Sequence, residues 1–197
     1  ITMTSALMAK YFNDVRWVHT FHSLERIRYK YIQKEKQKSM GLINWMQSSV
    51  TYPDAIISVS RSLKKEILKA YPDLKENKVF YIPNGVDTEI FKPGDLQSQD
   101  KRVLFVARFS LEKGIDLVEK IAWALLRKNN KVKVELIIPI YESMSEQMER
   151  IKNHLETLEK TFPERVIWHK EAVNREELAK IYNNCLVYIQ PSRYESF

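Results

Sequence analysis

The feature of the 197-residue sequence that most limits its fold is a regular alternation of short apolar runs with longer amphipathic stretches. This alternation is typical of a mostly parallel sheet covered by helices on both faces. The expected strands span 15–21, 55–59, 79–82, 103–106, 132–138, 166–168 and 186–189. The expected helices span 6–12, 24–48, 62–70, 114–130, 144–158 and a segment that Asn174 and Glu177 cap as a capping box. We therefore predict an α/β protein.

Two turn-forming segments divide this pattern into sets. Pro83, Asn84 and Gly85 end the first set, and the stretch that follows them, which contains Pro93 and Gly94, has no clear periodicity. We predict a first domain over 1–83, a linker over 84–100 and a second domain over 101–197. The sequence starts within a helical pattern and stops just after an expected strand, so we expect a fragment with both domains incomplete.

The positive charge is concentrated in the first predicted domain. Residues 1–83 carry 14 Lys/Arg against 7 Asp/Glu, which leaves 18 against 18 in 84–197 and gives the net charge of +7. Many of these cations crowd the expected helix 24–48, namely Arg26, Arg28, Lys30, Lys34, Lys36 and Lys38. Such a helix fits an anionic acceptor or peripheral contact with an anionic membrane, and it equally fits a solvated surface. No motif indicates nucleic-acid binding.

Cysteine content and hydropathy exclude other classes. The one cysteine, Cys185, cannot form a disulfide within the chain, and no Cys/His cluster indicates a metal site. A cytoplasmic location fits this reduced state best. No apolar run approaches the roughly 18 residues that a membrane-spanning helix needs.

Arg108 and Lys113 are the candidate binders of an anionic ligand in the second domain. They flank the turn between an expected strand and helix, where free backbone N–H groups and the positive helix end attract phosphate. A guanidinium fork and an ammonium point charge suit a diphosphate leaving group. An ordinary solvated turn is the alternative.

Glu195, His22 and Arg61 also follow expected strands, at the carboxyl edges where α/β sheets bind ligands. Glu195 is suited to accept hydrogen bonds from sugar hydroxyls, or to stabilise the start of a helix. His22 is a candidate site residue, with a capping or core histidine as the alternative. Arg61 is a candidate for an anionic acceptor group.

Taken together, these segments resemble the glycosyltransferase family 4 enzymes, which are retaining transferases of the GT-B fold. The matching motifs are a histidine-bearing strand end at 19–23, a "VS" strand at 57–60, "IPNGVD" at 82–87, "F-x-P" at 91–93, a relative of "GRxxxxKG" at 108–114 and "PSxxESF" at 191–197. The resemblance implies two facing Rossmann-like domains. It also implies transfer of a hexose from a nucleotide sugar to a sugar, sugar-phosphate or lipid acceptor.

The resemblance assigns roles to the candidate residues. Arg108 and Lys113 would hold the donor diphosphate, Glu195 would be the first carboxylate of an E-x7-E pair, and His22 would reach the donor sugar. Catalysis would use no metal and no cofactor, with the nucleotide sugar as substrate, and the donor base is not identified. Residues 169–174 are where some base contacts are expected.

The sequence departs from the family pattern in two places. Ala107 replaces a glycine before Arg108, and 137–141 lack the usual glycine pair, so the backbone approach to the donor differs. Because the second E-x7-E carboxylate would lie beyond Phe197, we expect the fragment alone to be inactive. The alternatives are a non-hydrolysing sugar-nucleotide epimerase and an inactive nucleotide-binding relative on the same fold.

Overall fold

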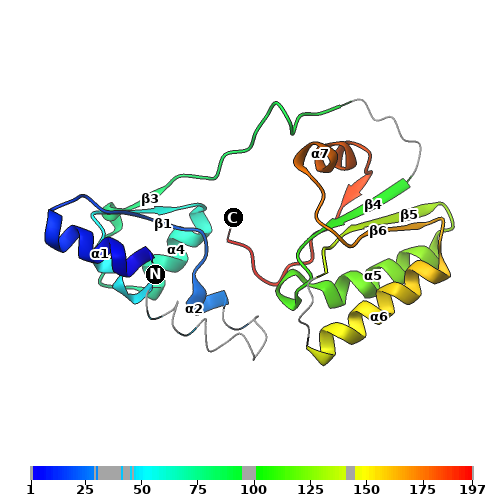
Figure 1. Ribbon diagram of the computed structural model, residues 1–197, viewed down its shortest axis with the longest axis horizontal. Helices are drawn as coiled ribbons and strands as arrows, with labels where there is room; N and C mark the ends of the chain where they lie inside the picture. Colours follow the sequence, from blue (N-terminus) through cyan, green and yellow to red (C-terminus); the bar gives the residue numbers. More distant parts are fainter. Residues whose placement is uncertain are drawn as a thin grey trace. The chain divides into compact units, whose positions relative to one another are not determined.

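The structure is a computed structural model that describes residues 2–28, 30, 41, 45, 47–94, 101–140 and 145–196. The chain forms two compact units, one of Ile1–Gly85 with Tyr194–Phe197 and the other of Val86–Arg193 (Figure 1). The predicted linker over 84–100 stays a prediction, since 95–100 lie outside the described residues.

The first unit is built on a parallel sheet with the strand order β1-β2-β3. Its elements are α1 (Thr2–Asn13), β1 (Val18–Phe21), α2 (Glu25–Arg28), η3 (Ser48–Thr51), β2 (Ala55–Ser58), α4 (Arg61–Ala70), η4 (Glu76–Lys78) and β3 (Val79–Tyr81). The expected helix 24–48 is described at its start, as α2, whereas Lys34, Lys36 and Lys38 lie outside the described residues.

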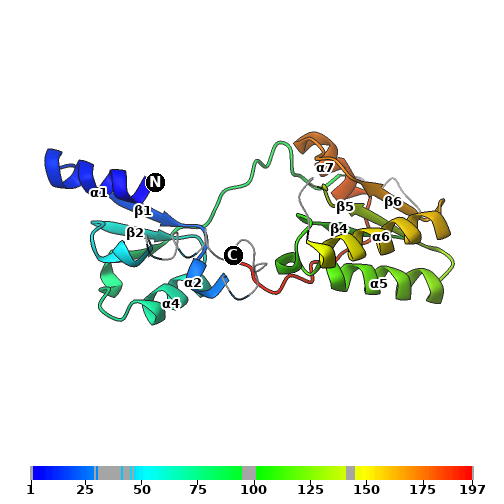
Figure 2. The same cartoon turned by 60° about the horizontal axis from the view of Figure 1, so that its bottom comes forward.

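Helix α4 covers one face of this sheet because its apolar residues recur at helical spacing. Leu63 and Ile67 are buried and join the cluster formed by Ile56, Val79 and Phe21. The helix begins where Ser60 accepts the Leu63 N–H at 3.0 Å, a side-chain cap that satisfies an otherwise orphaned donor. Figure 2 shows α1 on the opposite side of the sheet from α4.

The second unit contains a parallel sheet with the order β6-β5-β4-β7. Its elements are β4 (Lys101–Val106), η5 (Leu111–Lys113), α5 (Ile115–Lys128), β5 (Val132–Ile137), α6 (Glu146–Thr161), β6 (Val166–His169), α7 (Arg175–Asn183) and β7 (Val187–Tyr188). Every predicted strand and helix of this half is present, with ends that differ by a few residues. The 3-10 turn η5 was not predicted.

Successive side chains of β4 point to opposite faces of the sheet, so the second unit has a core cluster on each face. Val103 and Phe105 of β4 face a large cluster with α5 and α6, whereas Leu104 faces a smaller cluster with Ile181 of α7. Figure 1 shows α5 and α6 on one side of the sheet and α7 on the other. The two parallel sheets with flanking helices confirm the predicted α/β class. Among the described residues, no helix is both long and apolar enough to cross a membrane.

Candidate functional site

Each sheet brings the ends of its strands to one edge, and the predicted site residues follow those ends. In the first unit Phe21 pairs with Ser58, so the segments that carry His22 and Arg61 leave neighbouring strands at the same edge. In the second unit Val106 pairs with Ile137, which pairs with His169. The turn after β4 therefore shares an edge with the segment after β6, as ligand binding at the carboxyl edge requires.

The turn that carries Arg108 and Lys113 is rigidly built. Phe109 anchors its start in the core with 8% of its surface exposed. Gly114 ends η5 and begins α5 in the left-handed conformation, with φ 72°. A Cβ at Gly114 would lie 2.2 Å from the Pro191 carbonyl oxygen, so both the backbone angle and the close approach require glycine.

The two cations differ in their surroundings. The Arg108 side chain is 57% exposed, and its Nη2 lies 3.7 Å from Oε2 of the buried Glu112. Lys113 is half-buried at the end of η5, one residue before Gly114. Glu112 thus supplies an anchor that biases Arg108 toward the turn without burying its guanidinium.

Backbone amides at this turn are already engaged. Lys113 N–H donates to Ser110 O at 3.1 Å, Gly114 N–H to Leu111 O at 3.0 Å and Ile115 N–H to Ser110 O at 3.5 Å. The expectation of free N–H groups here is wrong for these three amides, because the 3-10 turn consumes them. Attraction for an anion at this point comes instead from the side-chain cations and the positive end of α5.

Glu195 lies in a segment that groups with the first unit. Tyr194 is buried and its hydroxyl accepts the Leu24 N–H at 3.2 Å, while the Ser196 carbonyl accepts the Ser60 hydroxyl at 2.5 Å. Glu195 itself is exposed, and described residues 189–196 have no regular helix. The structure thus assigns Glu195, His22 and Arg61 to the first unit, and Arg108 and Lys113 to the second.

The two histidines after β1 have different environments. His19 stacks edge-on with Phe21, with ring centroids 4.7 Å apart, and burial followed by the charge of His22 lowers its pKa. His22 is exposed at the strand end. His19 therefore belongs to the packing of the strand, whereas His22 is available to a ligand. Arg61 is exposed too, with its guanidinium 5.5 Å from the Tyr81 ring centroid.

Residues 169–174, where base contacts are expected, begin with an anchored histidine. His169 Nε2 lies 2.9 Å from Oε1 of the buried Glu135, whose other oxygen accepts from Arg102 at 2.6 Å. Because a carboxylate oxygen accepts, the Nε2 atom of His169 donates in this hydrogen bond, which fixes the ring at the sheet edge. The base contacts expected at residues 169–174 stay a prediction.

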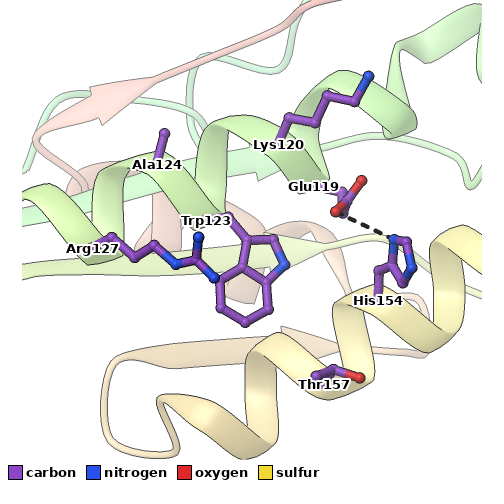
Figure 3. A pocket seen from close by; sticks show the side chains of 7 residues that line it. All are labelled: Glu119, Lys120, Trp123, Ala124, Arg127, His154 and Thr157. Atoms are coloured by element: carbon purple, nitrogen blue, oxygen red, sulfur yellow. Dashed lines mark ion pairs between the residues drawn. The ribbon is translucent and has the colours of Figure 1, made fainter.

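A groove of about 500 Å³ lies elsewhere in the second unit, between α5 and α6 (Figure 3). Its polar side chains pair with one another: His154 lies 3.4 Å from Glu119, and Arg127 stacks 4.6 Å from the Trp123 centroid. None of the predicted site residues lines it. Within the described residues, no group of three or more His, Cys, Asp or Glu side chains is arranged to hold a metal ion.

Sequence reasoning missed three residues that organise the turn 108–114. Glu112 anchors Arg108, and Arg193 is held by Asp116 in a bidentate ion pair with oxygen distances of 2.8 and 2.7 Å. Arg193 and Asp116 are 77 positions apart in the sequence. Only the topology, which returns β7 beside β4, brings them together, so no local sequence signal could have found the pair.

Curated relatives cover the chain almost completely. Alpha-maltose-1-phosphate synthase of Mycobacterium tuberculosis is 27% identical over 98% of this chain and 52% of its own length. D-inositol 3-phosphate glycosyltransferase of Nocardiopsis dassonvillei is 23% identical over 92% of this chain and 46% of its own length. The chain thus spans about half the length of the curated relatives it matches.

Solved structures and family models agree with these relatives. Sucrose-phosphate synthase from Thermosynechococcus elongatus has a TM-score of 0.76 at 21% identity, covering 100% of this chain and 49% of its own, which supports the GT-B fold. The model described as Glycosyltransferase Family 4 matches residues 1–90, and the model described as Glycosyl transferases group 1 matches residues 86–197. The chain belongs to the glycosyltransferase family 4 (glycosyl transferases group 1).

Proposed function

We propose that the full-length protein carrying this chain is a retaining glycosyltransferase that moves a hexose from a nucleotide sugar to a sugar, sugar-phosphate or lipid acceptor. The observation that carries the proposal is the pair of cations, Arg108 and Lys113, on a rigid turn at the carboxyl edge of β4 in a chain of this family. Glu112 lies 3.7 Å from Arg108 and leaves the arginine side chain 57% exposed.

Transfer requires stabilisation of the departing nucleoside diphosphate. Fixed cations aimed at developing negative charge lower the barrier most when they need no reorganisation during the reaction. Gly114 and the engaged amides of η5 hold the Lys113 backbone in place, and Glu112 restrains Arg108. We assign Arg108 to a forked contact with phosphate oxygens and Lys113 to a point-charge contact. We propose that no metal and no cofactor takes part.

The sugar and acceptor contacts are proposed for the first unit. His22 and Glu195 are both exposed, so the His22 ring can hydrogen-bond to sugar hydroxyls and the Glu195 carboxylate can accept hydrogen bonds from them. Arg61 follows β2 at the edge shared with His22 and is suited to an anionic acceptor. The names of the relatives include maltose-1-phosphate, sucrose-phosphate and inositol 3-phosphate, which supports a phosphorylated sugar in the reaction. We place the protein in the cytoplasm because its sequence has one cysteine.

Calorimetric titration tests the donor site. The full-length protein is titrated with UDP, GDP and ADP, and the measurement is repeated on an Arg108→Ala, Lys113→Ala double variant. We expect one diphosphate to bind and the double variant to lose on the order of a hundredfold or more in affinity, since charge-assisted hydrogen bonds contribute roughly 1.5–3 kcal/mol each.

The matched control removes the same charges elsewhere. Lys128 and Lys160 are exposed in the last turns of α5 and α6, so a Lys128→Ala, Lys160→Ala variant keeps the net charge of the test variant. Because each helix starts from a strand end at the carboxyl edge, its last turn lies toward the opposite edge of the sheet. The control should bind as the unaltered protein does. Equal losses in both variants would assign the effect to net charge, and binding that survives in the test variant would remove the donor site from this turn.

A further inference from the structure

Arg193 makes four hydrogen bonds, two to the turn 108–114 that carries the donor cations and two to Asp116 in the first turn of α5. Its Nη1 donates to Asp116 Oδ1 at 2.8 Å and to the Leu111 carbonyl at 2.6 Å, and its Nη2 donates to Asp116 Oδ2 at 2.7 Å. Its backbone N–H donates to the Glu112 carbonyl at 2.9 Å. The segment after β7 is therefore fastened to both η5 and the first turn of α5.

The guanidinium fork is what this geometry requires. A planar guanidinium presents two parallel N–H groups to one carboxylate and still has an N–H group for the carbonyl. A lysine ammonium is a point charge with rotatable donors and cannot reproduce this fork. The Arg193 side chain is 34% exposed and that of Asp116 is 23% exposed. Hydrogen bonding to Arg193 lowers the pKa of Asp116, so the carboxylate is charged at neutral pH.

A second contact locks the same two segments together. The Pro191 carbonyl approaches Gly114 so closely that a Cβ would lie 2.2 Å from its oxygen. Lys113 lies between the points of attachment, with Leu111 and Glu112 on one side and Gly114 on the other. Glu112, whose carbonyl accepts from Arg193, also pairs through its carboxylate with Arg108.

We propose that Arg193, held by Asp116, is a positioning residue that fixes the turn 108–114 so that Arg108 and Lys113 present their charges to the donor diphosphate. The proposal rests on the proposed function. Arg193 does not itself contact the diphosphate, because its fork is occupied by Asp116 and Leu111.

The test exploits the sign of the charge on Asp116. If Arg193 acted through its charge on the ligand, Asp116→Asn would remove a nearby anion and strengthen diphosphate binding. A positioning role predicts the opposite. In the full-length protein, calorimetry with the diphosphate among UDP, GDP and ADP that binds most tightly should show on the order of tenfold weaker binding for Asp116→Asn and for Arg193→Lys, since small misplacements of binding groups are costly.

Additional variants separate positioning from general effects. The double variant Arg193→Lys, Asp116→Asn should lose no more diphosphate affinity than either single variant, because each single variant already breaks the same interaction between these two residues. Asp73→Asn and Arg150→Lys make the same chemical changes at exposed positions outside the turn and should leave the affinity unchanged. Unchanged or tighter binding in Asp116→Asn overturns the proposal.

Hydrogen exchange gives a readout that needs no ligand. Peptides that cover 108–114 should exchange faster in Arg193→Lys and in Asp116→Asn, while peptides from β4 and β5 keep their protection, which shows that the unit remains folded. Should the unaltered protein bind none of the diphosphates, the proposed function fails while exchange still tests the fastening of the turn. If the unaltered protein binds a diphosphate and the Arg193→Lys and Asp116→Asn variants bind it equally tightly, only the positioning role fails.

Discussion

The replacement Gly114→Ala tests how the turn 108–114 is held in its conformation. An L-residue in the left-handed conformation at φ 72° costs about 1–2 kcal/mol relative to glycine. The added Cβ would also meet the Pro191 carbonyl oxygen at 2.2 Å, and forced overpacking costs about 1–3 kcal/mol more. The sum, about 2–5 kcal/mol, is a large fraction of a typical domain stability of about 5–15 kcal/mol.

Hydrogen exchange under native conditions measures this loss in the second unit itself. The free energy of opening reported by peptides from β4 and α5 should fall by about 2–5 kcal/mol in Gly114→Ala. Gly85→Ala is the matched control: no heavy atom of the described residues lies within 4 Å of its added Cβ, and its φ is outside the left-handed region. The control should change stability by less than about 0.5 kcal/mol. Equal stability of Gly114→Ala and the unaltered chain would refute the argument.

Three further predictions concern groups outside the turn. Asn174→Ala should destabilise α7 by about 1 kcal/mol, because the Asn174 side chain accepts the Glu177 N–H at 2.8 Å. Ser145→Ala should have little effect on α6, since no N–H group of the described part of α6 donates a capping bond to the Ser145 hydroxyl. Amide hydrogen exchange of the two helices measures both effects. Hydrogen bonds from Lys10 and from the Trp17 backbone N–H lower the pKa of Asp54 from 3.8 to about 2. The stability that these bonds supply is therefore complete above pH 4 and lost as the pH falls through 2. In Asp54→Asn, the free energy of unfolding measured against pH should lack this acid-dependent loss. Glu135→Ala should cost about 3–5 kcal/mol in denaturant unfolding, because Arg102 loses a buried partner at 2.6 Å, and a cost below 1 kcal/mol would contradict that reading.

The elements with strong periodicity were predictable from the sequence. Apolar residues of α5 and α6 recur at helical spacing, β4 contains the apolar run 103–106, and β5 alternates apolar with charged residues before Leu136, so pattern alone located them. The 3-10 turn Leu111–Lys113 was missed, because a turn this short has no periodicity. Gly114 was assigned to the following helix, although its positive φ makes it the residue that joins two helical segments.

The candidate site was predictable only where a residue carries its own signal. Arg108 and Lys113 were found because two cations flank a strand-to-helix turn. Their supports, Glu112, Asp116 and Arg193, could not be found, since an acidic residue near a helix start and an arginine in a loop have common surface explanations. The contact between Asp116 and Arg193 depends on β7 returning beside β4. No local pattern specifies this pairing of residues 103–104 with 187–188.

The most direct test of the account is the stereochemistry of transfer by the full-length protein. The protein is incubated with UDP-, GDP- and ADP-linked hexoses and a panel of sugar and sugar-phosphate acceptors, and the products are followed by NMR. The account predicts that one donor releases its diphosphate only when an acceptor is present, and that the product keeps the anomeric configuration of the donor. Diphosphate release and product formation should both disappear in the Arg108→Ala, Lys113→Ala variant. Diphosphate binding without acceptor-dependent release from any donor, or a product of inverted configuration, would contradict the account.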